Sequence, residues 1–356
     1  MIKKNKISLV TCGLLLTSTL SFASDSISDA FKEGSISGSA TLYGIDKDAK
    51  GGMKNSDDSF ATFGLSYETS EYKGLSAKAS FIGGHAFSNS SLDENSLMTE
   101  AYVKYTTDGF SVSAGRQEID LEWLGDYNES IVAAITSIPN TTIVAGFVNQ
   151  QAAADEDEIG KFDKITKDGA YVLDLKYTGI SSLELNPYFY SAVDVADFYG
   201  LKATYASDII GVTAQYAASS EEVGADGSIG HVELSTEVSG LSISTGYIKT
   251  DKDVGVKSIA AYGDNISPFD EGANTYSSDA KTVYASLGYT LAGVNLSALY
   301  GETDFSVSSE EKELNIAADY SFSDNLSLSV LYVDYDLEGS DSSDFNSVSG
   351  TVTYSF

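Results

Sequence analysis

Hydrophobic and polar residues alternate along most of the chain, in segments separated by turn residues. In the last segment, 345–356, the hydrophobic side chains from Val348 to Phe356 share one parity, and serine and threonine occupy the other. Because successive side chains of a strand point to opposite faces, each segment predicts a β-strand with one apolar and one polar face. Apolar-out, polar-in strands are typical of a transmembrane antiparallel β-barrel, and the alternative is a soluble β-sandwich.

The pattern predicts an all-β chain with about 18 strands, an even number as in single-chain bacterial barrels. Each segment is close to the roughly 9–11 residues with which a tilted strand crosses a membrane. Pro187 cannot donate to the strand ladder and predicts a bulge or a break in its segment. The predicted strands are 35–46, 58–69, 74–84, 98–107, 109–116, 129–137, 141–150, 169–178, 181–192, 196–206, 208–219, 228–238, 240–250, 279–290, 292–301, 311–322, 325–336 and 345–356.

Short and long connections alternate along the chain. Tight turns are predicted at, for example, Thr107-Asp108, Thr178-Gly179-Ile180 and Ser239-Gly240. Barrels place short turns at the periplasmic rim and long loops outside, so both chain ends are expected on the periplasmic side. The predicted long loops are 47–57, 85–97, 117–128, 151–168, 220–227, 251–278, 302–310 and 337–344.

The first residues carry an export pattern. Three lysines precede an apolar run that ends in the small-x-small sequence Ser21-Phe22-Ala23. This arrangement predicts a secretory signal peptide. The expected organisation is a signal peptide over 1–23, a periplasmic lead-in with one helical turn over 24–34, and a single barrel domain over 35–356.

Composition agrees with an exported barrel. No other stretch approaches the roughly 18 apolar residues of a membrane helix. The 23 tyrosines and 16 phenylalanines, many at strand ends, fit the aromatic girdles of outer-membrane barrels. Cys12 lies in the signal segment, so the mature chain is expected to hold no disulfide and no thiolate metal site. We therefore expect the bacterial outer membrane as location, with its lipids and the barrel assembly machinery as partners.

The chain is strongly acidic. Its formal net charge is −31, and removal of the three signal-peptide lysines takes it to −34. This charge excludes nucleic acid as a partner and favours cations near the protein. Acidic loops such as Asp155-Glu156-Asp157-Glu158 offer oxygen ligands for weak binding of calcium or magnesium, and a solvated surface is the alternative. No cofactor is otherwise expected.

Several short motifs resemble a known family. Gly115-Arg116-Gln117 opens the third long loop, Asp29-Ala30-Phe31 precedes the first strand, and Phe356 ends the last. These features resemble OprD-family porins, and the sequence from Glu122 to Tyr127 is similar to a loop of Campylobacter-type major porins. The resemblance implies an 18-stranded channel for small hydrophilic solutes, narrowed by inward-folded loops. A run of lumenal arginines is missing, which argues against a specific anionic substrate. The sequence does not determine the oligomeric state, and a homotrimer is the arrangement to test.

Strand parity predicts which charged side chains line the lumen. Acids outnumber bases on this face, and charge rings in a pore set its ion preference, so we expect cations to be preferred. The alternative is that glutamates and lysines neutralise one another across neighbouring strands. The acidic members are Glu68, Glu100, Asp174, Glu184, Glu233, Glu237, Glu313 and Asp319, and the basic members are Lys78, Lys104, Lys176 and Lys202.

The third long loop predicts the pore constriction. Its apolar residues are expected to pack against the inner wall, which leaves its acidic residues facing the pore opposite Arg116, the single arginine of the chain. A guanidinium stays charged and pairs with carboxylates, so Arg116 is expected to pin the loop. The alternative is a structural arginine that ties the loop to the rim. The apolar residues are Ile119, Leu121, Trp123 and Leu124, and the acidic residues are Glu118, Asp120, Glu122 and Asp126.

An enzyme is not expected. The chain has two histidines, His85 and His231, and neither falls in a recognisable catalytic or metal-binding motif. A structural or adhesive surface barrel with a closed lumen is the alternative to a porin. In either case Tyr354 and Phe356 form the predicted assembly signal.

Overall fold

The computed structural model describes residues 24–50, 54–87, 92–258, 266–305, 309–338 and 343–356. The predicted signal peptide over 1–23 lies outside these residues. Among the described helices, none combines the length and hydrophobicity needed to cross a membrane.

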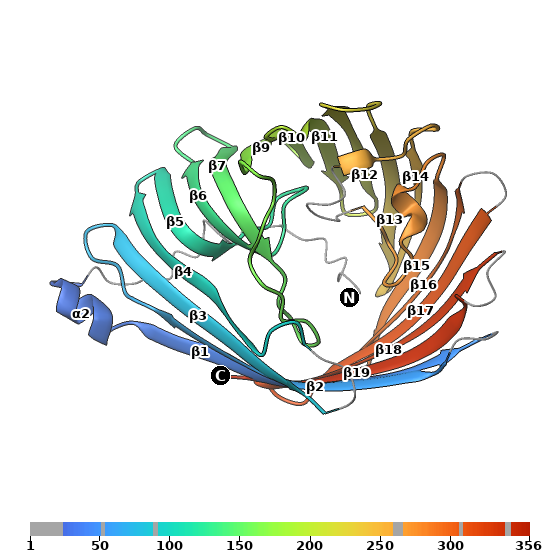
Figure 1. Ribbon diagram of the computed structural model, residues 1–356, viewed down its shortest axis with the longest axis horizontal. Helices are drawn as coiled ribbons and strands as arrows, with labels where there is room; N and C mark the ends of the chain where they lie inside the picture. Colours follow the sequence, from blue (N-terminus) through green and yellow to red (C-terminus); the bar gives the residue numbers. More distant parts are fainter. Residues whose placement is uncertain (1–23, 51–53, 88–91, 259–265, 306–308, 339–342) are drawn as a thin grey trace.

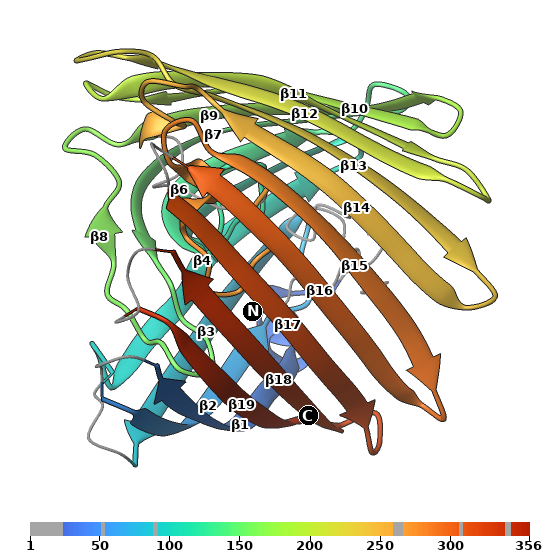
Figure 2. The same ribbon diagram turned by 90° about the vertical axis from the view of Figure 1, so that its right-hand side faces the viewer.

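The described strands form one antiparallel sheet that closes into a barrel (Figure 1). Eighteen strands make the wall, and each pairs with its neighbours in chain order until β19 returns to β1. Figure 2 shows strands β14 to β19 side by side and tilted, as barrel closure requires. The wall strands are β1 (Ser35–Ala49), β2 (Ser56–Glu68), β3 (Leu75–Ala86), β4 (Ser96–Thr107), β5 (Phe110–Glu118), β6 (Tyr127–Ile135), β7 (Thr141–Ala152), β9 (Ala170–Ile180), β10 (Leu183–Ala192), β11 (Ala196–Ala206), β12 (Gly211–Glu221), β13 (Ser228–Val238), β14 (Leu241–Thr250), β15 (Lys281–Leu291), β16 (Val294–Phe305), β17 (Ser309–Ser321), β18 (Leu326–Leu337) and β19 (Phe345–Ser355).

The predicted barrel of about 18 strands is confirmed, and each predicted strand overlaps one wall strand. One predicted turn is wrong, because β9 continues through Ile180 and the chain reverses at 181–182, where Ser182 has a φ of 63°. A two-residue strand, β8 (Asp163–Lys164), pairs with the end of β7 and had no sequence signal.

Pro187 does not break its strand. β10 runs without interruption from Leu183 to Ala192, and Pro187 pairs with Leu201 of β11. The recorded shift in register lies between Leu183 and Leu185, on the side of β9. The predicted irregularity is therefore present in this strand, two or more residues before the proline.

Two hairpins show why their turns are short. Ser239 and Gly240, and likewise Ala292 and Gly293, all have positive φ angles between 51° and 86°. Two consecutive residues of positive φ make the tight turn whose twist matches that of antiparallel strands. These turns fix the register of β13 with β14 and of β15 with β16.

The outer face of the wall is apolar and exposed, and leucine, isoleucine, valine and tyrosine side chains recur there on every second residue. Leu42, Val103 and Ile131, for example, each expose more than half of their surface. In water such a belt would promote aggregation, but it matches the hydrocarbon that surrounds an outer-membrane barrel.

A short helix precedes the wall, as predicted for the lead-in. Helix α2 (Ile27–Lys32) is capped by Ser26, which accepts from the backbone N–H of Asp29. Figure 1 shows α2 outside the ring of strands, beyond the start of β1. The Phe31 ring stacks on Tyr67 of β2 with centroids 6.5 Å apart, so the helix lies at the rim.

Candidate functional site

Three long connections fold back over the inner face of the wall. We name them by their residues: the 119–126 loop between β5 and β6, the 153–169 loop between β7 and β9, and the 251–280 loop between β14 and β15, of which residues 251–258 and 266–280 are described. The short 3-10 helix η2 (Asn274–Tyr276) belongs to the last of these. The residues that they meet on the inner wall form the candidate site.

The apolar side of the 119–126 loop is fully packed. Ile119, Leu121, Trp123 and Leu124 are buried in one cluster with inward-facing residues of the wall from β6 to β15. The loop is a small hairpin, since the backbone N–H of Ile119 donates to the carbonyl of Asp126 at 2.9 Å. The prediction that these residues pack against the inner wall is confirmed.

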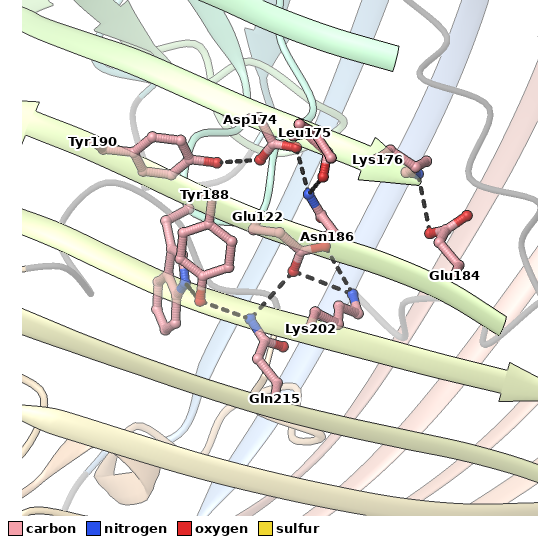
Figure 3. Close-up of polar contacts among 11 residues, drawn as sticks. Glu122, Asp174, Leu175, Lys176, Glu184, Asn186, Tyr188, Tyr190, Lys202 and Gln215 are labelled. Atoms are coloured by element: carbon pink, nitrogen blue, oxygen red, sulfur yellow. Dashed lines mark hydrogen bonds and ion pairs between the residues drawn. The ribbon is translucent and has the colours of Figure 1, made fainter. Parts of the chain in front are cut away.

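Glu122 of this loop is the centre of a polar network (Figure 3). Its carboxylate accepts from Lys202 Nζ at 3.1 Å and from Gln215 Nε2 at 3.2 Å. Gln215 also donates to the hydroxyl of Tyr188 at 3.3 Å, and the indole N–H of Trp123 donates to the same hydroxyl at 3.0 Å. Loop and wall are therefore joined by one charged and several neutral contacts.

Asp174 lies beside this network on β9 and is held by neutral donors. It accepts from the Tyr190 hydroxyl at 2.8 Å and from Asn186 Nδ2 at 2.6 Å, and it is almost fully buried (Figure 3). Hydrogen bonds of this kind satisfy a carboxylate without cancelling its charge. Glu233 on β13 is similar, because it accepts from the Tyr284 hydroxyl at 2.7 Å. His231 meets the same Tyr284 hydroxyl through Nε2 at 2.9 Å.

The predicted lumenal lysines lie close to carboxylates. Lys78 pairs with Glu100 at 2.7 Å, and Lys176 pairs with Glu184 at 3.4 Å. For Lys104 the neighbouring acids are Glu68 and Glu71, with which it interacts electrostatically.

The other predicted acids of the wall differ in their surroundings. Asp319 accepts from Ser329 Oγ at 2.5 Å, and Glu237 is exposed near the end of β13. Glu313 is completely buried beneath the 251–280 loop and accepts from its backbone. A fully buried carboxylate cannot take part in a hydrated ion path, so Glu313 lies beside the lumen rather than on its surface.

The Gly-Arg-Gln motif has a clear local geometry. Gly115 has a φ of 130°, in a region that L side chains rarely adopt. Gln117 is buried and donates from Nε2 to Ser130 Oγ at 2.8 Å, which joins β5 to β6 at the base of the 119–126 loop.

The ion pair that the structure gives for Arg116 is with the barrel wall, and its place in the constriction stays a prediction. Its recorded ion pair joins Nε to Glu129 of β6 at 3.7 Å, and its guanidinium lies 4.2 Å from the centre of the Phe162 ring. The loop carboxylate for which the structure gives a basic partner is Glu122, and this partner is Lys202. Glu118, Asp120 and Asp126 are exposed at or beside the loop.

Loop and wall residues that sequence reasoning missed are mostly neutral. Tyr188, Tyr190, Asn186 and Gln215 lie on the inner face, and parity alone could have placed them there. The sequence prediction of the lumenal face rested on charged residues, and these donors carry no charge. Across the part of the chain that the structure describes, no group of three acidic, histidine or cysteine side chains is arranged to hold a metal. Weak binding of a divalent cation by the acidic loops stays a prediction.

Comparison with protein families identifies the chain. Residues 20–209, more than half of the 356, match the model of a family described as "Putative outer membrane protein". The chain belongs to this outer-membrane protein family. Its predicted location in the bacterial outer membrane is therefore confirmed. No curated protein matches the chain.

Solved structures share the fold of this outer-membrane protein. A BenF-like porin from Pseudomonas fluorescens Pf-5 superposes with a TM-score of 0.78 at 12% identity, covering 92% of this chain and 99% of its own. OccK8 (OprE) from Pseudomonas aeruginosa gives 0.76 at 14%, with 92% and 98% covered. OccAB4 from Acinetobacter baumannii gives 0.75 at 16%, with 90% and 98% covered. The resemblance to OprD-family porins is confirmed at the level of fold, and the similarity to Campylobacter-type porins stays a prediction.

Proposed function

We propose that this protein is a porin, a water-filled channel through which small hydrophilic solutes and ions diffuse passively. The observation that carries the proposal is a closed 18-stranded barrel whose inner face holds polar and charged side chains beside the apolar cluster that packs the 119–126 loop. The similarity in fold to Occ porins and the BenF-like porin supports it. A passive channel needs no catalytic residues, in agreement with the expectation that the chain is not an enzyme.

We further propose that the channel prefers cations. Lys78, Lys176 and Lys202 each pair with a carboxylate, which leaves them little charge to attract an anion. Glu233, by contrast, is only partly buried and is held by the neutral hydroxyl of Tyr284, which leaves its charge uncompensated. Negative charge on the low-dielectric wall of a water-filled lumen attracts cations and repels anions.

One structural neighbour suggests a contrast in substrate. The crystal structure of Pseudomonas aeruginosa OpdK contains vanillate, an aromatic carboxylate. For a substrate of that charge a channel needs accessible basic groups, and here the recorded lysines of the inner face are engaged by acids. We therefore propose neutral and cationic solutes for this chain.

The test is a planar-bilayer recording of the purified protein in a salt gradient. We expect discrete conductance steps and a reversal potential of the sign that cation flow produces. A reversal potential of the opposite sign would refute cation preference and leave the porin intact.

A structural or adhesive barrel with a closed lumen is the competing function. The close packing of the 119–126 loop, where Trp123 is completely buried, favours it, because such packing fills part of the lumen. Absence of conductance steps from correctly folded, heat-modifiable protein would support this alternative and refute the porin.

A further inference from the structure

Two buried glutamates of β17 hold the backbone of the 251–280 loop. The carboxylate of Glu313 accepts from the backbone N–H of Asp270 at 2.7 Å, of Glu271 at 3.2 Å and of Gly272 at 2.6 Å. Three consecutive N–H groups that converge on one carboxylate form a concave anion site of the kind known as a nest. Here the anion belongs to the barrel wall and the nest belongs to the loop.

Glu311 extends this contact by one more step along the loop. It accepts from the backbone N–H of Asn274 at 3.3 Å and also from the Asn274 side chain. On its other side it accepts from the Tyr335 hydroxyl of β18 at 3.1 Å. Gly272 passes so close that a Cβ added there would lie 2.5 Å from Glu311 Oε1.

Both carboxylates are completely buried, with no exposed surface. Burying a charged group is costly unless hydrogen bonds replace its lost hydration. The loop backbone supplies those bonds, and the carboxylates in turn accept from loop N–H groups that would otherwise face the wall unpaired. The loop therefore stabilises the two buried carboxylates, and the carboxylates stabilise the inward position of the loop.

The held segment lies where it can affect the lumen. Glu271 forms an ion pair of 3.1 Å with Lys47 of β1, which lies on the far side of β19 and β18 from Glu313. The ring of Tyr276 lies 6.2 Å from that of Trp123, so the 251–280 loop also meets the 119–126 loop. The loop thus bridges separate parts of the inner wall.

We propose that Glu311 and Glu313 are positioning residues that latch the 251–280 loop inside the barrel and thereby set the width of the channel. This inference rests on the proposed porin function for its effect on conductance, but the latch itself is a statement about loop position. Neither glutamate serves as an ion site, and both act through the loop backbone.

The experiment compares Glu313→Gln and Glu311→Gln with a matched control, Asp319→Asn. Asp319 lies on the same face of β17 and its recorded partner is Ser329, so the control removes one carboxylate charge from the same strand face and leaves the contacts of the loop in place. Each substitution is made in full-length protein that also carries Asp270→Cys, which reports loop position by its rate of modification with a maleimide. Single-channel conductance is measured on the same proteins.

We expect both glutamine variants to react about tenfold faster than the Asp270→Cys parent, since hydrogen bonds to a charged group are weakened in each. Their single-channel conductance should rise, whereas Asp319→Asn should match the parent in modification rate. Unchanged modification rates in both glutamine variants would overturn the latch.

Two further results separate the possible failures. Faster modification without conductance in any protein, the parent included, would keep the latch in place but refute the porin. Faster modification with unchanged conductance in a conducting parent would overturn the role of the latch in setting channel width. If a glutamine variant does not fold, Gly272→Ala replaces it, because this substitution keeps both carboxylates and displaces the loop by its added methyl group. Faster maleimide modification and a higher conductance are then expected, and an unchanged modification rate would overturn the latch.

Discussion

The indole N–H of Trp123 donates to the hydroxyl of Tyr188 at 3.0 Å, and both side chains are buried inside the barrel. The contact joins the 119–126 loop to β10, which is 65 residues away in sequence. Burial of the large indole ring stabilises the contact, and the hydrogen bond fixes the orientation of the ring. Trp123 and Tyr188 thus help to fix the position of the 119–126 loop relative to β10.

The first prediction concerns this contact. Trp123→Ala removes the buried ring and is expected to destabilise the packed loop by about 3–5 kcal/mol. Tyr188→Phe removes one hydroxyl and leaves the indole N–H unpaired, at a cost of about 1–3 kcal/mol. Urea unfolding and limited proteolysis of the 119–126 loop measure both. Tyr199→Phe, an exposed tyrosine of the outer face, is the control and should behave as the parent.

The second prediction uses the pair between Glu122 and Lys202, 3.1 Å apart. Lys202→Gln leaves the carboxylate without its cation and should increase cation preference. Glu122→Gln leaves the ammonium without its anion and should decrease it. Reversal potentials in a salt gradient are expected to move in opposite directions. Shifts of the same sign would show that the pair affects loop position rather than lumenal charge.

The third prediction concerns Arg116, which the structure pairs with Glu129 and stacks on Phe162. If Arg116 shapes the field at the constriction, Arg116→Ala changes the reversal potential while thermal unfolding stays unchanged. Arg116→Lys keeps the positive charge and should retain the ion selectivity of the parent. Unchanged conductance and ion preference in an inserted Arg116→Ala barrel would remove Arg116 from the constriction.

The fourth prediction concerns pH and the 153–169 loop. Burial, followed by a hydrogen bond with Asp155, raises the pKa of Asp157 from 3.8 to about 7. Tyr43 of β1 is also a hydrogen-bond partner of Asp157, which places this loop against the inner wall. Because the packed loop binds the proton more tightly than a released loop, the stability that packing contributes falls as pH rises from about 4 to about 7.

Hydrogen exchange of residues 153–160, corrected for intrinsic rates, tests this dependence. Protection is expected to be greater at pH 5.5 than at pH 8 in the parent and equal at both values in Asp157→Asn. Asp168→Asn is the control, because Asp168 is an exposed residue of the same loop that does not contribute to the raised pKa of Asp157, and it should keep the dependence. Equal protection in the parent at the two pH values would contradict the prediction.

The fifth prediction concerns closure of the barrel. Phe356 exchanges backbone hydrogen bonds of 2.9 and 3.0 Å with Gly38, and its ring stacks between Phe63 and Tyr354. Phe356→Ser removes the ring and keeps the backbone pairing, so assembly should slow and less heat-modifiable barrel should reach the outer membrane. Phe63→Ser, which removes the stacking partner on the exposed face of β2, shows whether loss of the ring contact alone slows assembly. Normal amounts of Phe356→Ser barrel in the membrane would exclude an assembly role.

Strand parity is a local property, and it was sufficient for much of this protein. A period of two follows from strand geometry alone, so the wall strands, their faces and the alternation of turns and loops could be predicted without any tertiary contact. The same parity placed Lys78, Lys176 and Asp174 on the inner face, where the structure has them. The apolar side chains of the 119–126 loop also predicted its packing, because they are poorly suited to water.

Partnerships between residues far apart in sequence were decided only by the tertiary structure. Nothing in the sequence around Arg116 indicates that Glu129 is its partner and that Lys202 takes Glu122 instead. Glu313 has the parity of a lumenal charge, yet it is buried by a loop whose path depends on closure of the whole barrel. A pattern along one strand specifies the face on which a side chain lies, whereas its neighbours across the lumen are set by strand number, tilt and loop packing together.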